Sequence, residues 1–83
     1  MAQLTEFEEL TEREIEVLKV LAEGKTNEQI AEALGIAPTT AKTHVQNIFS
    51  KFYLTEKDGN NRVIAVIMGL KNKLINLSML NIA

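Results

Sequence analysis

The sequence predicts an all-α fold, a four-helix bundle that contains a helix-turn-helix. Three observations carry this prediction. First, apolar residues recur at helical intervals in four segments. Second, these segments begin or end at residues typical of helix termini. Third, no segment bounded by turns shows the alternation of apolar and polar residues typical of a β-strand. The 83 residues fit one small domain, in which we expect an N-terminal arm at 1–10, a core at 11–75 and a C-terminal tail at 76–83.

The first two expected helices, at about 12–23 and 27–34, each begin with a capping box. In this motif a Thr caps the helix and a Glu or Gln three positions later returns a hydrogen bond to the cap. Thr11 with Glu14 and Thr26 with Gln29 have this spacing. A glycine follows each apolar stripe and is expected to terminate the helix. Together the two segments predict a pair of short helices joined by a turn.

The third expected helix, at about 38–52, begins with Pro38, whose missing N–H is not needed at a first helical position. Its apolar residues fall on one arc and should face the core: Ala41, Val45, Ile48, Phe49 and Phe52. The opposite face is neutral and polar, with Thr39, Thr43, Gln46, Asn47 and Ser50. Lys42 and Lys51 flank this face, and the helix contains no Asp or Glu. Such a face favours a polyanion, because amides and hydroxyls can meet base edges while lysines reach phosphates.

A polar, turn-rich loop at 53–60 precedes the fourth expected helix, which we expect Asn61 to cap. This helix has two apolar stripes. The stripe expected to face the core comprises Val63, Val66, Ile67, Leu70 and Leu74, and the second comprises Ile64, Met68 and Ile75. Because one stripe suffices for the core, the second predicts a partner, most simply a second copy of the chain. The alternative is that Tyr53, Phe7 or the tail covers it within the same chain.

The charge is uneven along the chain. A net charge of −2 alone argues against a nucleic-acid partner. Residues 1–36, however, hold nine acidic and three basic residues, whereas residues 37–83 hold two acidic and six basic residues. The resulting net charges of −6 and +4 hint at a polyanion partner for the second half, although two solvated helix faces would give the same split.

Composition argues against several kinds of site. The chain has no Cys, which excludes disulfides, thiolate metal sites and a cysteine nucleophile, and His44 has no second ligand for a metal. No Ser has a base at a suggestive spacing, and no cleft is evident for paired carboxylates, so we expect neither an enzyme nor a cofactor. No apolar run reaches the roughly 18 residues of a membrane span. We therefore expect a cytoplasmic protein with no membrane partner.

Several segments resemble the LuxR-type helix-turn-helix domain, also called the NarL/FixJ or GerE type. These segments are LTEREIEVL at 10–18, AEG at 22–24, TNEQIA at 26–31, LGI at 34–36 and TAKTHVQNI at 40–48. The resemblance implies a DNA-binding transcription regulator that docks as a dimer, with its third helix in the major groove and its fourth at the dimer contact. It leaves open whether the chain is a free-standing regulator or the effector domain of a longer response regulator.

The resemblance also implies roles for individual residues. It assigns base-facing positions to Lys42, Thr43 and Gln46, and phosphate contacts to nearby hydroxyls and amides and to Lys51. With Thr39 on the same outer face, the predicted DNA-binding residues are Thr26, Thr39, Thr40, Lys42, Thr43, Gln46, Asn47 and Lys51. The predicted dimer contact comprises Ile64, Met68, Lys71 and Ile75.

The sequence departs from the family pattern at four places. Ala37 stands where a capping side chain is usual, so the third helix lacks a cap worth about 1 kcal/mol. Glu32 stands where basic residues are often found, which should weaken non-specific DNA binding. The link before the fourth helix is longer by the insertion at 55–61, interpreted as a tolerated surface insertion. Lys73 replaces a terminal glycine, so the fourth helix is expected to run on toward Asn76.

Two functions from different classes follow. The first, which the resemblance favours, is a sequence-specific regulator that binds double-stranded DNA as a homodimer on an inverted repeat, with RNA polymerase as a further partner. The second is a protein-interaction module of the same fold that pairs with another regulator or a polymerase subunit, motivated by the acidic first half. The effect of charge reversal at Lys42, compared with that of charge reversal at Glu12 and Glu16, distinguishes the two functions.

Overall fold

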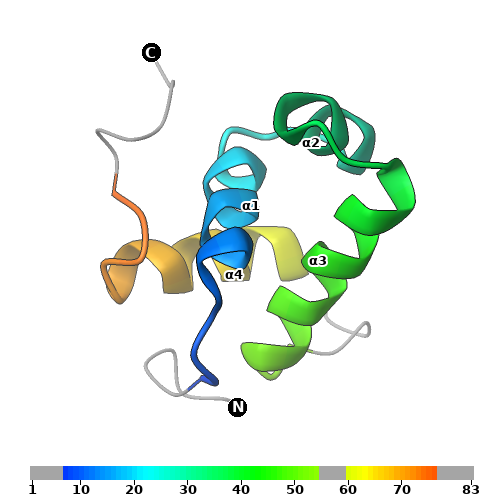
Figure 1. Ribbon diagram of the computed structural model, residues 1–83. Coiled ribbons are helices and arrows are strands. Elements are labelled where there is room, and N and C mark those ends of the chain that lie inside the picture. Colours follow the sequence, from blue (N-terminus) through cyan, green and yellow to red (C-terminus); the bar gives the residue numbers. More distant parts are fainter. Residues whose placement is uncertain (1–6, 55–59, 77–83) are drawn as a thin grey trace.

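The computed structural model describes residues 7–54 and 60–76. Within these ranges it has four helices: α1 (Glu12–Ala22), α2 (Asn27–Leu34), α3 (Pro38–Lys51) and α4 (Asn61–Lys71). Helix α4 crosses behind α1, and α2 and α3 lie to the right of α1 in this view, with the start of α4 near α3 (Figure 1). The all-α prediction, with α2 and α3 as the helix-turn-helix, is confirmed. Most of the insertion at 55–61 lies outside the described residues.

Both predicted capping boxes are formed. Oγ1 of Thr11 accepts from the Glu14 amide at 3.1 Å, and Oε1 of Glu14 accepts from the Thr11 amide at 2.8 Å. Thr26 and Gln29 repeat the pattern at 3.2 and 2.9 Å. Each box satisfies two backbone N–H groups near a helix start, which would otherwise lack an intrahelical partner. Side-chain hydrogen bonds therefore define where α1 and α2 begin.

Helix α4 begins one residue earlier than a cap at Asn61 would require. The amide of Ile64 donates to the carbonyl of Asn60 at 3.0 Å, which makes Asn60 the N-cap and Asn61 the first helical residue. Neither residue caps the helix through its side chain, and Oδ1 of Asn61 is buried without a hydrogen-bond partner among the described residues. The prediction that Asn61 caps α4 is wrong.

Residues with left-handed backbone conformations follow the helices: Gly24, Gly35, Tyr53 and Lys73. After α4, the amide of Lys73 donates to the Leu70 carbonyl at 3.2 Å and the amide of Leu74 donates to the Gly69 carbonyl at 2.9 Å. This pair of bonds forms a Schellman motif, which terminates a helix. Helix α4 therefore ends at Lys71, and the longer helix expected from the sequence is wrong.

The core lies among all four helices and begins before residue 11. Leu10 is buried, and the ring of Phe7 packs edge-on against that of Phe52 with their centroids 5.3 Å apart. The amide of Glu8 also donates to the Lys51 carbonyl at 2.8 Å. The described part of the N-terminal arm is therefore fastened to the end of α3.

The face that α4 turns to the core differs from the expected one. The residues of α4 that are buried are Ala65, Met68 and Gly69. In the stripe expected to face inward, Val66, Leu70 and Leu74 are partly buried and pack against the core, but Val63 is 59% exposed and Ile67 is 46% exposed. A Cβ on Gly69 would lie only 2.9 Å from a terminal methyl of Leu18 in α1. The small residues let α4 approach α1 closely. This close packing, and not the number of apolar residues on a face, decides which face of α4 points to the core.

Candidate nucleic-acid interface

Helix α3 presents a polar surface to solvent because its apolar residues are held in the core. Ala41, Val45, Ile48 and Phe52 are each at most 3% exposed, and Phe49 is half-buried. All but one of the α3 residues predicted to contact DNA are exposed. We call these exposed residues the α3 face: Thr39, Thr40, Lys42, Thr43, Gln46 and Asn47. Six side chains that can donate or accept hydrogen bonds are thus accessible on one helix.

The start of α3 carries no side-chain cap and no carboxylate. Ala37 occupies the N-cap position without a side-chain hydrogen bond, Pro38 follows, and the first turn has no acidic residue. The missing cap expected from the sequence is confirmed. The backbone N–H groups of this turn and the positive end of the helix dipole are therefore not neutralised by a side chain of α3, an arrangement that favours an anion such as a phosphate.

Two threonine hydroxyls assigned to DNA contact already have backbone partners. Oγ1 of Thr43 donates to the Thr39 carbonyl at 3.0 Å, which uses its proton and leaves its methyl group and lone pairs for a ligand. Oγ1 of Thr26 instead accepts from the Gln29 amide, so its proton remains available. In this arrangement Thr43 suits an apolar contact with a thymine methyl group, and Thr26 suits donation to a phosphate.

Lys51 is engaged within the protein. Its Nζ lies 2.7 Å from Oε1 of Glu14, and its side chain is 24% exposed, while that of Glu14 is 6% exposed. The same oxygen accepts from the Thr11 amide. A buried carboxylate requires a cationic partner and Lys51 supplies it, so Lys51 has a structural role, and the phosphate contact that the resemblance assigns to it stays a prediction.

The environment of Glu14 lowers the pKa of its carboxyl group. Burial acts in the opposite direction, because desolvation disfavours the charged form. The hydrogen bond from Lys51, the bonds from the amide and hydroxyl of Thr11, and the charge of Lys51 together outweigh burial and bring the pKa below its ordinary value of 4.5. Glu14 is therefore charged at neutral pH, and its ion pair joins the start of α1 to the end of α3.

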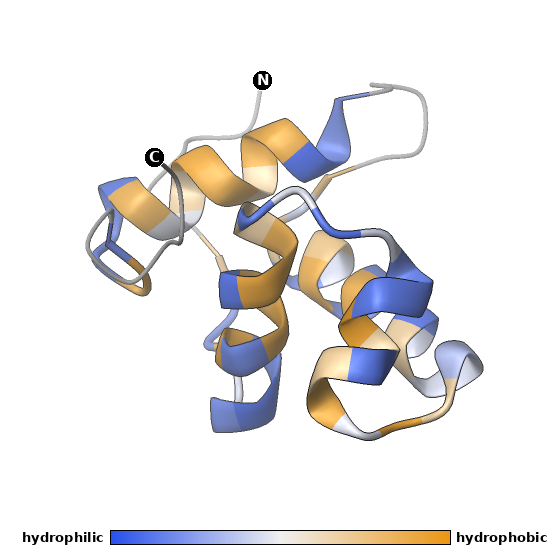
Figure 2. Cartoon of the chain, turned by 90° about the horizontal axis from the view of Figure 1, so that it is seen from above, coloured by the Kyte–Doolittle hydropathy of each residue, from blue (hydrophilic) through white to orange (hydrophobic). Residues whose placement is uncertain are grey.

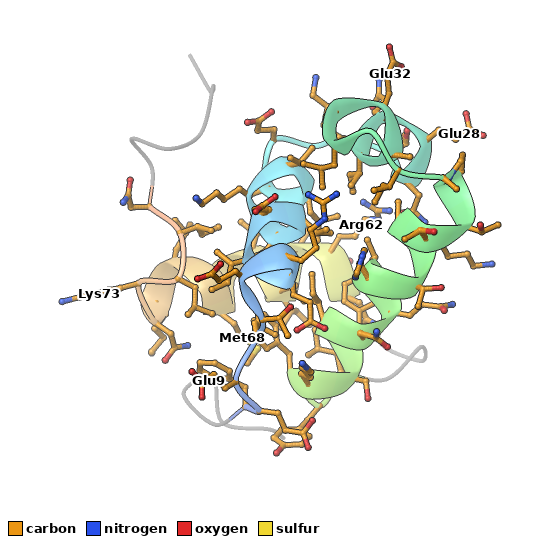
Figure 3. The ribbon with its side chains drawn as sticks, viewed as in Figure 1. Glu9, Glu28, Glu32, Arg62, Met68 and Lys73 are labelled. Carbon is orange, nitrogen blue, oxygen red and sulfur yellow. The ribbon has the colours of Figure 1, made fainter. Side chains whose placement is uncertain are left out.

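Carboxylates are confined to one half of the described chain. They lie at Glu8, Glu9, Glu12, Glu14, Glu16, Glu23, Glu28 and Glu32. The described residues after position 32 include no Asp or Glu, and their cations are Lys42, Lys51, Arg62, Lys71 and Lys73. Glu28 and Glu32 project outward from α2 (Figure 3). An anion that approaches α3 thus meets cations and neutral groups on this helix.

The four residues predicted for the dimer contact lie in different environments. Met68 and Ile75 are each 1% exposed and belong to the core, so neither offers surface to a partner. Ile64 is half-buried and packs against the core, and Lys71 is exposed. The prediction is therefore corrected for Met68 and Ile75, whose stripe faces α1 because Gly69 allows a close approach there.

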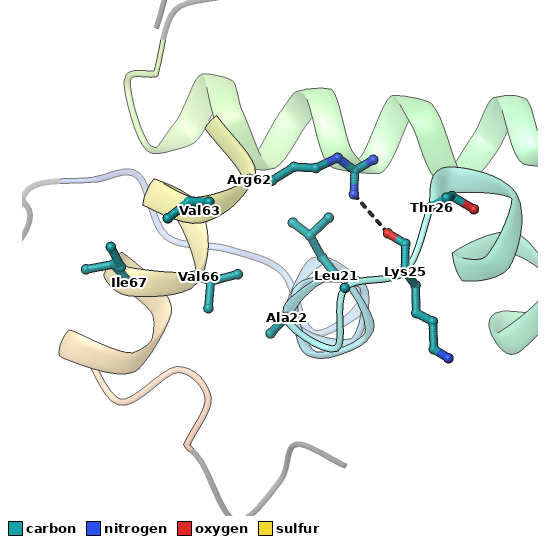
Figure 4. Close-up of a pocket in the computed structure, with 9 residues that line it drawn as sticks. Leu21, Ala22, Lys25, Thr26, Arg62, Val63, Val66 and Ile67 are labelled. Carbon is teal, nitrogen blue, oxygen red and sulfur yellow. Dashed lines mark hydrogen bonds between the residues drawn. The ribbon is translucent and has the colours of Figure 1, made fainter. Parts of the chain in front are cut away.

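An apolar groove of about 510 Å³ lies between the end of α1 and the outer side of α4 (Figure 4). We call it the α1–α4 groove, and its apolar lining comprises Leu21, Ala22, Val63, Val66 and Ile67. Apolar residues occupy most of α4 in Figure 2. Sequence reasoning assigned Val63 and Ile67 to the core. The spacing of Ala65 and Gly69, four residues apart, is the signal that could have placed the outer face correctly.

Other kinds of site find no support in residues 7–54 and 60–76. His, Asp and Glu form no group of three there that could hold a metal ion. Within the same ranges, each helix is too short or too polar to cross a bilayer. The α3 face is thus the described surface that best combines exposure with groups suited to a nucleic acid.

Comparison with known proteins gives one family and a set of relatives. Residues 8–58 match the family described as bacterial regulatory proteins, luxR family (GerE). The chain is 45% identical over 69 residues to the transcriptional regulatory protein LiaR of Bacillus subtilis, and 44% identical over 69 residues to the response regulator protein VraR of Staphylococcus aureus. The aligned segment is 83% of this chain but only 30% and 31% of these relatives, so the chain spans less than a third of their length.

Proposed function

The chain belongs to the luxR family as a DNA-binding, transcription-regulating helix-turn-helix domain, and from this premise we propose that it acts as a homodimer on an inverted repeat. Each copy inserts α3 into the major groove, and the half-sites lie about one helical turn apart. The family is one of regulatory proteins and not of enzymes. Because its relatives include a response regulator, we further propose that the chain works as the effector domain of such a protein.

The observation that carries this proposal is the α3 face, which is exposed and free of carboxylates. Lys42, Thr43 and Gln46 lie within one turn of each other and read base edges in the proposed complex. Thr26 and Asn47 contact phosphates on either side and fix the register of the helix on the duplex, as do Thr39 and Thr40 at the start of α3.

The α1–α4 groove supports the proposed dimer. Val63 and Ile67 expose large apolar surface beside this groove, and a second copy related by a two-fold axis would cover both. Ile64 and Lys71 then lie near the edge of the contact. In this arrangement the α3 faces of the two copies remain accessible to one duplex.

The carboxylates of the first two helices support a protein partner for the DNA-bound dimer. Glu12 and Glu16 are exposed on α1, and Glu32 is exposed on α2. These side chains are poor ligands for phosphates and suit a basic protein surface. We place a contact with RNA polymerase there. Charge reversal of Glu12 and Glu16 should then reduce transcription from a target promoter without loss of DNA binding.

Selection from a random duplex pool at roughly physiological salt tests the DNA proposal. We expect wild type to enrich a symmetric motif, Lys42→Glu to enrich none, and the distant control Lys73→Glu to enrich the wild-type motif. If wild type enriches nothing even at protein concentrations above roughly 0.1 mM, the upper range of weak non-specific binding, the proposal is wrong. The protein-interaction alternative would then be favoured.

Sedimentation of the free protein tests the dimer. Ile67→Asp places a charge in the α1–α4 groove and should shift the protein from dimer to monomer, because burial of an unpaired charge is costly. Ala33→Asp introduces the same charge at an exposed position on α2 and should leave the dimer intact. Equal sedimentation of wild type and Ile67→Asp would contradict this interface.

A further inference from the structure

A second groove, of about 570 Å³, lies between α3 and the start of α4, with the start of α2 at its edge. We call it the α3–α4 groove. Its polar lining comprises Asn27, Lys42, Gln46, Asn60, Asn61 and Arg62, and none of the described residues that line it carries a carboxylate. It therefore combines two cations with four amides, in a protein whose net charge is negative.

Arg62 is held in place at the edge of this groove by two neutral acceptors. Its Nη1 donates to the Lys25 carbonyl at 3.0 Å, drawn in Figure 4, and its Nη2 donates to Oδ1 of Asn27 at 2.6 Å. The side chain remains exposed. Because a guanidinium has five N–H donors, other donors of Arg62 remain for a ligand. The two bonds orient the group before any ligand arrives, which reduces the entropy lost on binding.

Among the described residues, no acidic side chain pairs with Arg62 or Lys42. Neither residue takes part in the ion pairs found among the described residues, which join Arg13 to Glu16 and Lys51 to Glu14. Both of these groove cations can therefore neutralise an external anion. Arginine is particularly suited to a phosphate, because its planar fork can donate two parallel hydrogen bonds.

The α3–α4 groove is continuous with the α3 face. Lys42 and Gln46 belong to both surfaces, and Asn27 directly follows Thr26, a proposed phosphate contact. When a recognition helix enters the major groove, the sugar–phosphate backbones that border this groove run along the sides of the helix. The α3–α4 groove opens along one such side.

We propose that the α3–α4 groove binds the sugar–phosphate backbone of one DNA strand, with Arg62 as a phosphate contact opposite Lys42. This inference rests on the proposed function. It adds a contact from α4, a helix to which the sequence assigns only the dimer. Arg62 thereby has two roles: it fastens α4 to the turn before α2, and it binds the strand that passes over this turn.

The salt dependence of DNA binding tests the proposal. The probe is a fluorescent 20-base-pair random-sequence duplex, titrated by anisotropy between roughly 50 and 200 mM salt, the range over which phosphate contacts are lost. The slope of log K against log salt is negative, and removal of one phosphate contact should make it less steep by about 0.9. We expect this reduction for Arg62→Gln. The control Lys73→Gln removes the same charge beyond the end of α4 and should keep the wild-type slope.

Arg62→Lys separates phosphate binding from the structural role of Arg62. It keeps the charge but loses the fork that bridges Lys25 and Asn27, so the slope should stay near that of wild type even if the melting temperature falls. If Arg62→Lys makes the slope less steep to the same extent as Arg62→Gln, the loss of binding comes from the structural role of Arg62 and the proposal is wrong. It is equally wrong if Arg62→Gln binds with the wild-type slope.

Asn60→Asp provides a test that does not depend on the fold tolerating a change at Arg62. Asn60 lines the groove at the N-cap of α4, where the negative charge of Asp should interact favourably with the helix dipole and stabilise the helix while it repels a phosphate. We expect a higher melting temperature with weaker DNA binding and a smaller slope. Unchanged binding would overturn the groove proposal. If wild type itself fails to bind the duplex, the proposed function fails instead.

Discussion

The two pairs of helices are built differently at their N-termini. Helices α1 and α2 both begin with complete capping boxes and carry acidic residues in their first turns. Helices α3 and α4 begin without side-chain cap bonds and without acidic residues in their first turns. The first pair is therefore stabilised locally, whereas the second leaves its helix starts free of negative charge. The pair of helices proposed to face DNA thus lacks caps worth about 1 kcal/mol each, which suits contact with a polyanion.

The largest stability effect expected is at the ion pair that joins the two halves. Lys51→Met leaves the carboxylate of Glu14 in the protein with no cationic partner, which should reduce the free energy of unfolding by about 2–3 kcal/mol. Urea denaturation at pH 7 measures the loss. Lys71→Met, at an exposed position in the last turn of α4, is the matched control and should change stability by less than about 0.5 kcal/mol. Equal effects of the two changes would contradict a structural role for Lys51.

The same pair predicts a pH dependence of stability. The pKa of Glu14 is lower in the folded protein than its ordinary value of 4.5, so the unfolded chain binds the proton more tightly. Its contribution is therefore fully present above about pH 4.5 and is lost as the pH falls through the lowered folded pKa. Lys51→Met should flatten the pH profile of the unfolding free energy in this acidic range. A variant profile that falls as steeply as that of wild type would contradict the assignment.

Removal of a capping box should have the next largest effect. Thr26→Ala eliminates the side-chain acceptor at the start of α2 and should cost about 1 kcal/mol of unfolding free energy, measured by thermal denaturation. Thr40→Ala removes an exposed threonine that caps nothing, and the higher helix propensity of Ala should leave stability equal or slightly higher. A loss at Thr40 as large as that at Thr26 would argue against local capping as the source of stability.

Addition of a cap to α3, the helix proposed to contact DNA, should separate the effect on stability from the effect on DNA binding. Ala37→Ser and Ala37→Asp both supply a missing acceptor at the start of α3, and each should stabilise the protein by about 0.5–1 kcal/mol. Only Asp places a negative charge there, so DNA affinity should fall for Ala37→Asp and stay near wild type for Ala37→Ser. Anisotropy titration and melting curves on the same samples provide the comparison. Equal DNA affinities for the two variants would contradict the proposal that the uncapped start of α3 favours DNA binding.

The smallest effect expected concerns the end of α4. Lys73 has a φ of 61°, a conformation that disfavours residues with a Cβ. Lys73→Gly should therefore stabilise the protein by about 0.5 kcal/mol, since relief of strain exceeds the entropy that glycine loses on folding. Lys71→Gly, inside the helix, should instead destabilise it by about 1 kcal/mol. A loss of stability for Lys73→Gly would contradict the Schellman termination.

The features predicted correctly from the sequence are those set by short-range chemistry. The capping boxes at Thr11 and Thr26, the buried arc of α3 and its uncapped start each depend on residues within a few positions of one another. Such local patterns fix hydrogen bonds and helix faces without knowledge of the tertiary structure. For this reason the exposed residues of the α3 face could be identified from the sequence.

The features that were missed depend on long-range packing. Lys51 meets Glu14 across 37 positions, and no periodicity along either helix indicates this pairing. The orientation of α4 depends on the contact between Gly69 and Leu18, where a missing side chain matters more than the apolar ones. Arg62 likewise reaches the turn before α2, 37 residues earlier at Lys25. Contacts between distant segments thus decide which exposed residues adjoin the α3 face.

The central claim is that the α3 face, and not the acidic surface of α1, contacts DNA. The most direct measurement is the affinity of Lys42→Glu, Glu12→Lys and Glu16→Lys for a duplex that carries the enriched site, at one salt concentration. We expect a loss of roughly a hundredfold for Lys42→Glu, since a base or phosphate contact becomes a repulsion, and wild-type or tighter binding for the two Glu variants. Wild-type affinity for Lys42→Glu together with loss of binding for Glu12→Lys and Glu16→Lys would contradict it.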